Sequence, residues 1–269
     1  MREGPSARRR FLDMLCSQLS PGCFLALQQY QQALEERNAL LRESRKTGIA
    51  PDAGMMEAFE QTMAAQTAVI IRMRRRVMAQ LKPIAEAKYT AISGRSGEPF
   101  GMDYRCCVEA EVPDEQVAEA VAQRLRACRR EDSFRGSTSF GPHHEEIELT
   151  LSGRPMKLFA SQGQQRTAAL AMKLSQLALF RQETGDAPVL LLDDVMSELD
   201  MTRRTRLLSE LEGLQTFVTC TDESDLEGCG LHRSYRVSLT EDLTAAVAQT
   251  GEGEEIQAAP PEPEEPDFT

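Results

Sequence analysis

Two acidic residues follow a short apolar run in the C-terminal half of the chain: Asp193-Asp194 comes directly after Val189-Leu190-Leu191-Leu192. Such a run is typical of a parallel strand buried on both faces, and α/β proteins bind ligands at the carboxyl ends of these strands. Two buried carboxylates repel each other, and a divalent cation such as Mg²⁺ removes that cost. We therefore expect Asp193 to bind Mg²⁺ and Asp194 to orient or deprotonate an attacking water molecule. An acidic pair that caps a turn explains the pattern equally well when it is considered alone.

A polar segment, Ser161-Gln162-Gly163-Gln164-Gln165-Arg166, lies about one helix earlier. Apolar residues recur at helical spacing from Gln164 to about Gln182, so this segment opens a helix. The free N–H groups and partial positive charge of a helix N-terminus favour a phosphate. Gly163 would let the backbone approach it, and Ser161 and the glutamines would add donors. Viewed alone, an N-capped helix after a polar loop is the simpler interpretation.

The acidic pair and the polar segment belong to a predicted strand–helix–strand unit. A helix is expected over about 201–211, and Thr216–Thr221 predicts the next parallel strand. A last strand is expected at about 235–239. The tail from residue 243 is expected to be disordered, because its final stretch from Thr250 holds seven acidic residues and no Lys or Arg.

The N-terminal half predicts helices. One helix ends near residue 20 at Pro21-Gly22, and leucines seven apart predict a second over about 23–45. A longer third helix follows a polar loop, and the two form an αα-hairpin. Beyond it we expect a loop over 89–101, a strand over 102–111, a helix over 114–130, and two short strands, one over 147–151 and one ending at Phe159.

Composition is that of a globular protein of 269 residues, 41% of them hydrophobic. No run reaches the roughly 18 apolar residues of a membrane span, and the start does not have the form of a signal peptide, so we expect a cytoplasmic protein. The seven cysteines are odd in number with no C-x-x-C pair, which favours reduced, mostly buried thiols over a metal site.

Charge is unevenly distributed. Removing the seven tail acids from the formal charge of −11 leaves −4 on the remainder. That part carries three arginine clusters, at 8–10, 72–76 and 203–206. A solvated helix face is the usual meaning of such clusters, ahead of a phosphate contact.

In combination, the polar loop, its helix, the acidic strand end and Ser197-Glu198-Leu199-Asp200 resemble the signature loop, Walker B strand and D-loop of ABC ATPases. The segments SQGQQR at 161–166, LLLDDVMSELD at 190–200, TFVTCTD at 216–222 and GPHHEE at 141–146 resemble the bacterial RecF family. RRRFLD at 8–13 and ALEERNALLR at 33–42 are similar to that family as well. The resemblance extends to about residue 240.

The resemblance implies an α/β fold: a partial ABC-ATPase head, that is, a RecF-like P-loop NTPase lobe, with an inserted helical hairpin arm. It implies a remnant of the N-terminal ATPase lobe over 1–20, and the arm with a connecting α/β segment over 21–133. The C-terminal ATPase lobe would span 134–242, and the acidic tail 243–269.

The resemblance also implies ATP and Mg²⁺ as cofactors and a homodimer that forms on ATP. In such a dimer Ser161, Gln162, Gly163 and Gln164 contact the nucleotide of the opposite subunit, while Ser197 and Asp200 link the two sites. Binding to single-stranded DNA or single-strand/duplex junctions, cooperation with a RecR-type mediator, and roles in recombinational repair, replication and the SOS response are implied too. The arginines expected to contact DNA are Arg72, Arg74, Arg75, Arg76, Arg203 and Arg204.

The chain lacks one motif of the family: no segment matches G-x-x-x-x-G-K-[ST], the Walker A loop. We expect the chain to begin inside the family's sequence, about a hundred residues late, and to show no ATP turnover alone. An alternative is a catalytically inactive relic that acts as a DNA- or partner-binding module, and the DNA upstream of Met1 distinguishes the two. A chromosome-maintenance relative is disfavoured by the short arm at 23–88.

Overall fold

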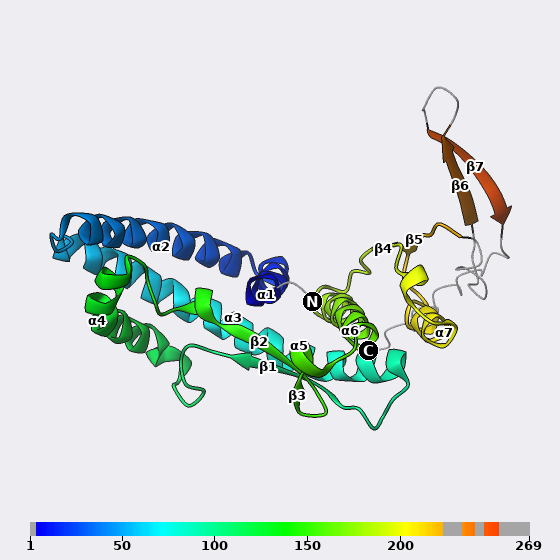
Figure 1. The fold of residues 1–269 in the computed structure, drawn as a ribbon, viewed down its shortest axis with the longest axis horizontal. Coiled ribbons are helices and arrows are strands. Elements are labelled where there is room, and N and C mark those ends of the chain that lie inside the picture. The colour runs from blue at the N-terminus through cyan, green and yellow to red at the C-terminus, as the bar shows by residue number, and fades with distance from the viewer. Residues whose placement is uncertain (1–3, 223–232, 240–244, 253–269) are drawn as a thin grey trace, which may run out of the picture. The chain divides into compact units, whose positions relative to one another are not determined.

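The computed structural model describes residues 4–222, 233–239 and 245–252. It divides the chain into two compact units, 1–219 and 220–269, which are treated separately (Figure 1). Among the described residues, none of the helices is both long and apolar enough to cross a membrane. Every residue of the expected site lies in the first unit, and the expected domain boundaries after residues 20, 133 and 242 stay predictions.

Three helices open the first unit: α1 (Pro5–Leu19), α2 (Pro21–Thr47) and α3 (Ala53–Ser93). The Ser20 side chain caps α2, and α2 ends at Gly48, whose φ of 73° suits glycine. α2 and α3 lie side by side in opposite directions (Figure 1), which confirms the predicted αα-hairpin.

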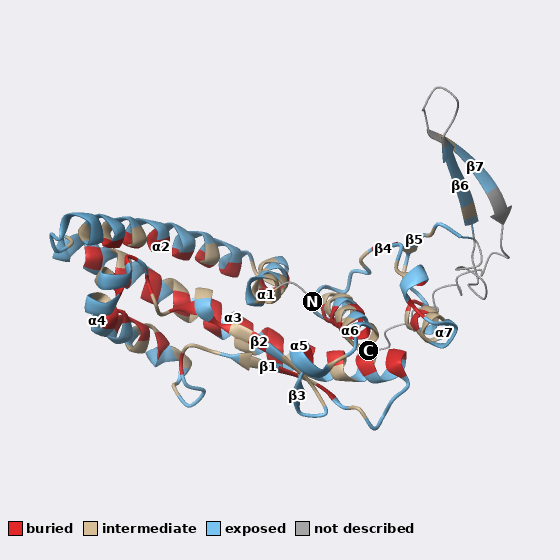
Figure 2. Cartoon of the chain, viewed as in Figure 1, coloured by how far each residue is buried: buried red, intermediate tan, exposed pale blue. Residues whose placement is uncertain are grey.

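α3 is longer than the sequence pattern predicts. A loop was expected from Tyr89, yet Tyr89 and Ile92 lie fully buried in the last turns of the helix. The helix stops instead at Gly94, which has a φ of 64°. Buried residues run along α3 (Figure 2), so tertiary packing extends it past the polar Thr90.

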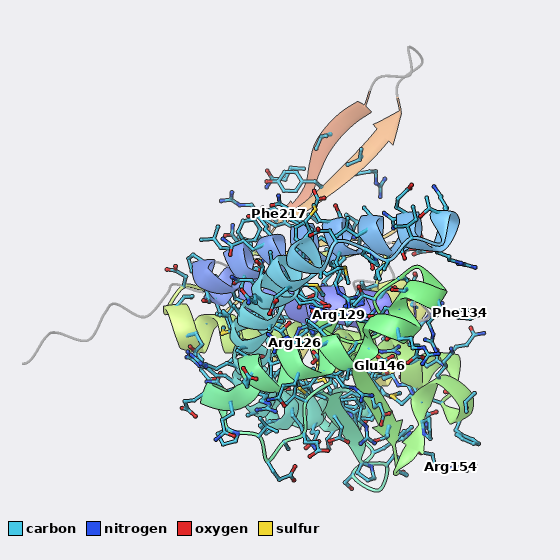
Figure 3. All side chains as sticks on the ribbon, turned by 90° about the vertical axis from the view of Figure 1, so that its left-hand side faces the viewer. Arg126, Arg129, Phe134, Glu146, Arg154 and Phe217 are labelled. Carbon is cyan, nitrogen blue, oxygen red and sulfur yellow. The ribbon has the colours of Figure 1, made fainter. Side chains whose placement is uncertain are left out.

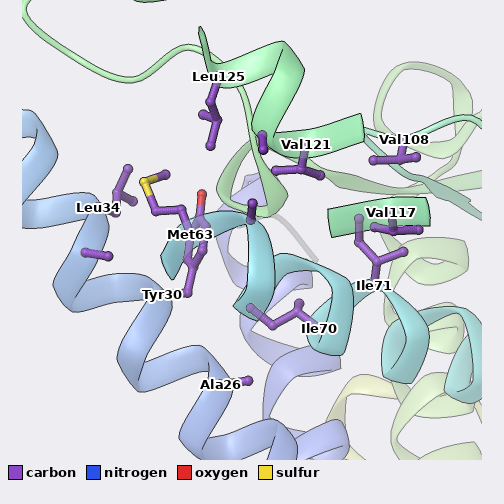
Figure 4. Packing of buried hydrophobic residues seen from close by; sticks show 13 residues of the cluster. Ala26, Tyr30, Leu34, Met63, Ile70, Ile71, Val108, Val117, Val121 and Leu125 are labelled. Atoms are coloured by element: carbon purple, nitrogen blue, oxygen red, sulfur yellow. The ribbon is translucent and has the colours of Figure 1, made fainter. Parts of the chain in front are cut away.

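The hydrophobic core of the arm lies where α2 and α3 meet η1 (Asp114–Gln116) and α4 (Val117–Arg135). Figure 4 shows this cluster, which brings together side chains from distant parts of the chain. It includes Ala26, Tyr30, Leu34, Met63, Ile70, Ile71, Val108, Val117, Val121 and Leu125.

One arginine joins the same helices through ion pairs. Arg37 is fully buried, and its guanidinium lies 3.0 Å from a Glu60 oxygen and 2.8 Å from an Asp132 oxygen. It also donates to the Thr138 hydroxyl at 2.8 Å. Arg129 of α4, which Figure 3 labels, adds a second cation to Glu60. Each buried charge therefore has a partner, as the cost of desolvation requires.

An antiparallel sheet follows, in the order β1 (Phe100–Arg105), β2 (Glu146–Leu151), β3 (Arg154–Pro155). The strand predicted to end at Phe159 is wrong. Pairing stops at Pro155, which cannot donate a ladder hydrogen bond, and Met156–Phe159 forms the helical turn α5.

The predicted strand–helix–strand unit is confirmed. α6 (Gln162–Thr184) leads to β4 (Leu190–Asp193), and α7 (Met201–Glu210) leads to β5 (Thr216–Thr219), which is parallel to β4. The short turn η3 (Met196–Glu198) lies between β4 and α7.

Burial of β4 on both faces is wrong. Leu190 and Leu192 are buried, whereas Leu191 is 72% exposed. Its register partner Phe217 is 56% exposed. The face of this two-stranded sheet that carries Leu191 and Phe217 therefore lies open, and within the described residues β4 pairs with β5 alone.

The second unit holds an antiparallel hairpin of β6 (Arg233–Leu239) and β7 (Ala245–Glu252). The strand expected at 235–239 is confirmed. Disorder from residue 243 is wrong for 245–252, because Val247 pairs with Val237 and the acidic, proline-rich composition begins only near Glu252. The tail from 253 lies outside the described residues.

Candidate nucleotide half-site

The acidic pair sits where two parallel strands end together. Asp193 is the last residue of β4 and stands in register with Thr219, the last residue of β5. The Thr219 hydroxyl donates to Asp193 Oδ1 at 2.6 Å. The Asp194 N–H donates to the Thr219 carbonyl at 3.2 Å and lies 3.1 Å from its hydroxyl oxygen. Thr219 therefore fixes both acids. The acidic motif does not indicate this role, because it depends on the register between β4 and β5.

Asp194 has an unusual backbone. Its φ of 51° lies in the left-handed region, which costs a non-glycine residue about 1–2 kcal/mol. The Ser197 hydroxyl donates to the Asp194 carbonyl at 3.0 Å and supports the turn. Strain held in place by a dedicated hydrogen bond is common at functional sites.

Both acids are exposed, so the expected buried pair of carboxylates is wrong. Their oxygens, with the Thr219 hydroxyl, are hard donors of the kind Mg²⁺ accepts alongside water and phosphate. In the described part of the chain, no three His, Cys, Asp or Glu side chains gather at one point as a metal site. These residues therefore fit a cation that takes most of its ligands from water and from a nucleotide.

The polar loop forms a complete capping box at the start of α6. Ser161 Oγ accepts from the Gln164 N–H at 3.2 Å, and Gln164 Oε1 accepts from the Ser161 N–H at 2.8 Å. The Ser161 hydroxyl keeps its own proton to donate. The N–H groups of the first turn beyond this box point from a helix terminus toward any bound anion.

Gly163 also makes room for a neighbouring side chain, while its expected approach to a phosphate stays a prediction. A Cβ at this position would lie 2.9 Å from Arg203 Nη1, so the missing side chain makes room for an arginine of α7. Asp200 caps α7 by accepting from the Arg203 N–H at 2.9 Å. Arg166, one turn into α6, pairs with Glu198 at 2.8 Å. The polar loop and the segment that follows the acidic pair therefore pack together.

Within the described residues, no hydrogen bond or ion pair joins Asp193 or Asp194 to the loop Ser161–Gln164. The structure brings the loop beside Glu198 and Arg203 and holds the acids at the end of β4. The polar loop and the acidic pair are therefore two separate half-sites, and residues 194–203 connect them.

The DNA role expected of Arg74 is wrong in this structure. Its side chain is 2% exposed; it bonds to both Asp13 oxygens at 2.9 Å and also pairs with Glu145. Burial raises the pKa of Asp13, while the Arg74 charge beside it lowers that pKa. A guanidinium so enclosed joins α1, α3 and the 142–145 turn, and cannot reach a phosphate.

The other candidate arginines differ in exposure. The side chains of Arg72 and Arg76 are about 60% exposed, and they pair with Asp114 and Glu183, respectively. Arg75 is partly buried against backbone carbonyls.

Arg203 and Arg204 are engaged at the start of α7. Arg203 is 16% exposed and pairs with Asp200 at 3.5 Å, whereas Arg204 Nε donates to the carbonyls of Met196 and Leu199. Both therefore stabilise the turn between β4 and α7. Of the six arginines, Arg72 and Arg76 remain the most accessible to a phosphate.

Comparison with known proteins identifies consistent relatives, although no protein-family model matches the chain. It is 36% identical over 225 residues to the DNA replication and repair protein RecF of Ruminiclostridium cellulolyticum, covering 83% of this chain and 60% of that protein. It is 38% identical over 228 residues to RecF of Caldanaerobacter subterraneus, covering 85% and 62%. A solved structure of the recombination mediator protein RecF-ATPrS in the RecFOR pathway superposes with a TM-score of 0.77 at 34% identity, covering 93% and 64%. The chain thus spans about three fifths of the length of these relatives.

Proposed function

The chain belongs to the RecF family of DNA replication and repair proteins, and from that premise we propose that it acts in recombinational repair by binding DNA in an ATP-dependent way. Because the chain covers 60–62% of its relatives, the proposed activity is that of an assembly in which this chain supplies part of each nucleotide site.

The observation that carries the proposal is the acidic pair pinned by Thr219 at the joint end of β4 and β5. A solved RecF structure with ATP, also at a TM-score of 0.77, supports ATP as the nucleotide. Asp193 would hold Mg²⁺, which neutralises phosphate charge. Asp194, which is exposed and has a left-handed backbone, would orient or deprotonate the attacking water.

The start of α6 would serve a second nucleotide, held by another subunit. The Ser161 hydroxyl and the N–H groups of Gln162 and Gly163 form the phosphate-facing end of the helix. Gln164 would act indirectly, because its amide is already hydrogen-bonded on both sides. Ser197 and Asp200, which hold the turn between the two half-sites, would link hydrolysis in one to binding in the other.

For DNA, we propose single strands and single-strand/duplex junctions, with phosphates contacted by the exposed Arg72 and Arg76. The RecFOR pathway named for the solved RecF structure supports a RecR-type mediator as partner. A role in the SOS response follows from the same assignment.

The test is a fusion in which a RecF segment that carries a Walker A loop precedes this chain. We expect the fusion to hydrolyse ATP in the presence of single-stranded DNA and to dimerise on ATP. Asp194→Asn should lower hydrolysis at least a hundredfold, on the order expected for loss of a general base, while dimerisation persists. Asp186→Asn, an exposed acid in the α6–β4 link, is the matched control and should hydrolyse like the parent.

Hydrolysis by Asp194→Asn at the parental rate would remove Asp194 from the mechanism. A fusion that binds DNA but neither binds nor hydrolyses ATP would favour a non-catalytic DNA- or partner-binding module.

A further inference from the structure

A carboxylate from outside the recognised motifs reaches the polar loop. Glu98 lies in the loop between α3 and β1, and its Oε2 accepts from Gln164 Nε2 at 2.9 Å. Glu98 also pairs with Arg95 at 3.0 Å. The Gln164 hydrogen bond, followed by Arg95, lowers the pKa of Glu98, so the acceptor is the charged carboxylate. A charge-assisted hydrogen bond is stronger than a neutral one.

This contact completes the restraint on Gln164. The amide oxygen is bound to the Ser161 N–H at 2.8 Å, and the amide nitrogen is bound to Glu98. The side chain therefore cannot rotate without breaking one of two bonds. Because the Gln164 side chain holds the Ser161 N–H while it is itself held by Glu98, the position of Ser161 depends on where Glu98 stands.

The same end of α3 also holds α7. A Cβ at Gly94, the C-cap of α3, would overlap the Arg206 guanidinium, so α7 packs on the cap itself. Lys88, in the last turns of α3, pairs with Glu210 of α7. The end of α3 therefore contacts α7, the loop that follows it contacts the polar loop, and α3, 41 residues long, extends into the arm.

We propose that Glu98 is a positioning residue for the polar loop: it holds Gln164 so that Ser161 and the first N–H groups of α6 face the phosphate of a nucleotide on another subunit. The proposal rests on the proposed function. A consequence is that a displacement of the α3 terminus moves the loop with it, which connects the arm to nucleotide binding.

Amide hydrogen exchange on the unfused chain tests the positioning without any nucleotide. In Glu98→Ala, the amides of Ser161 and Gln164 should exchange about fivefold faster, the effect of losing one hydrogen bond. Glu98→Gln keeps an acceptor oxygen and should stay within about twofold of the wild type. Arg95→Ala removes the other partner of the carboxylate and serves as the control, with unchanged exchange at both amides. Unchanged exchange in Glu98→Ala would overturn the proposal.

The RecF fusion then separates positioning from general damage. In Glu98→Ala, the ATP concentration that half-saturates dimerisation should rise about fivefold, in line with one lost hydrogen bond. ATP binding at protein concentrations too low for dimers should be unchanged. A loss of ATP affinity in the monomer, or unchanged dimerisation, would contradict the role assigned to Glu98. A parent fusion that never dimerises on ATP would instead refute the proposed function and leave the exchange experiment to decide on Glu98.

Discussion

A histidine in the 142–145 turn is predicted to make the fold sensitive to acid. His143 Nδ1 lies 2.5 Å from the Tyr30 hydroxyl, and its Nε2 faces the Thr138 carbonyl at 3.4 Å. The neutral ring, with Nε2 protonated, fits both partners. Burial, reinforced by the neighbouring His144, lowers the pKa of His143 from 6.5 to about 4. The folded protein therefore keeps this ring neutral where an unfolded chain would protonate it.

The sign and size of the effect follow from linkage. Between pH 6.5 and 4 the unfolded chain binds more protons than the folded one, so the free energy of unfolding falls as pH falls. From about pH 8 to pH 5, the shift corresponds to a loss of roughly 2 kcal/mol from His143. Asp13, whose pKa is raised by burial, contributes with the opposite sign at lower pH. Its contribution is the same in wild type and His143 variants and cancels in their difference.

The assay is urea unfolding followed by far-ultraviolet circular dichroism at about pH 8 and pH 5. His143→Asn keeps an acceptor for the Tyr30 hydroxyl and cannot titrate in this range, so the roughly 2 kcal/mol should vanish from its pH dependence. His144→Asn, one residue on and exposed, is the matched control and should keep most of the wild-type pH dependence. Equal losses in wild type and His143→Asn would refute the reasoning.

Three further predictions concern packing and the site. Gly94→Ala places a Cβ both at positive φ and against a packed arginine of α7, and should cost about 1–3 kcal/mol in urea unfolding, whereas Gly97→Ala, with nothing nearby, should cost under about 0.5. Arg37→Met leaves the buried Asp132 without its cation and Glu60 with Arg129 alone, and should cost about 3–5 kcal/mol in the same assay; a loss below about 1 would contradict the buried network. Thr219→Val removes the hydroxyl that fixes Asp193 and should slow ATP hydrolysis by the RecF fusion about tenfold, with Thr216→Val, at the other end of β5, as the control that should not.

Much of the site was predictable because its determinants are local. The Ser161 cap, the apolar run of β4 and the acids that follow it are each encoded in a few adjacent residues, and the structure places the cap at the start of α6 and the acids at the end of β4, although neither the strand nor the acids are buried as expected. Thr219 and Glu98 were not predictable in the same way. Thr219 reaches Asp193 through the register of β5 with β4, and Glu98 reaches Gln164 because α3 ends beside the polar loop. Both residues lie far in sequence from the residue that they contact.

By itself the sequence determined the strand–helix–strand unit, the helical hairpin and the family, since periodicity, caps and motifs act over a few residues. It could not rank the arginines: Arg72, Arg74 and Arg76 look alike along the chain. Tertiary structure decided that Arg74 is buried, because its partners Asp13 and Glu145 lie 61 and 71 residues away. A charge can be buried only where folding brings an opposite charge to it, and local sequence does not specify where that happens.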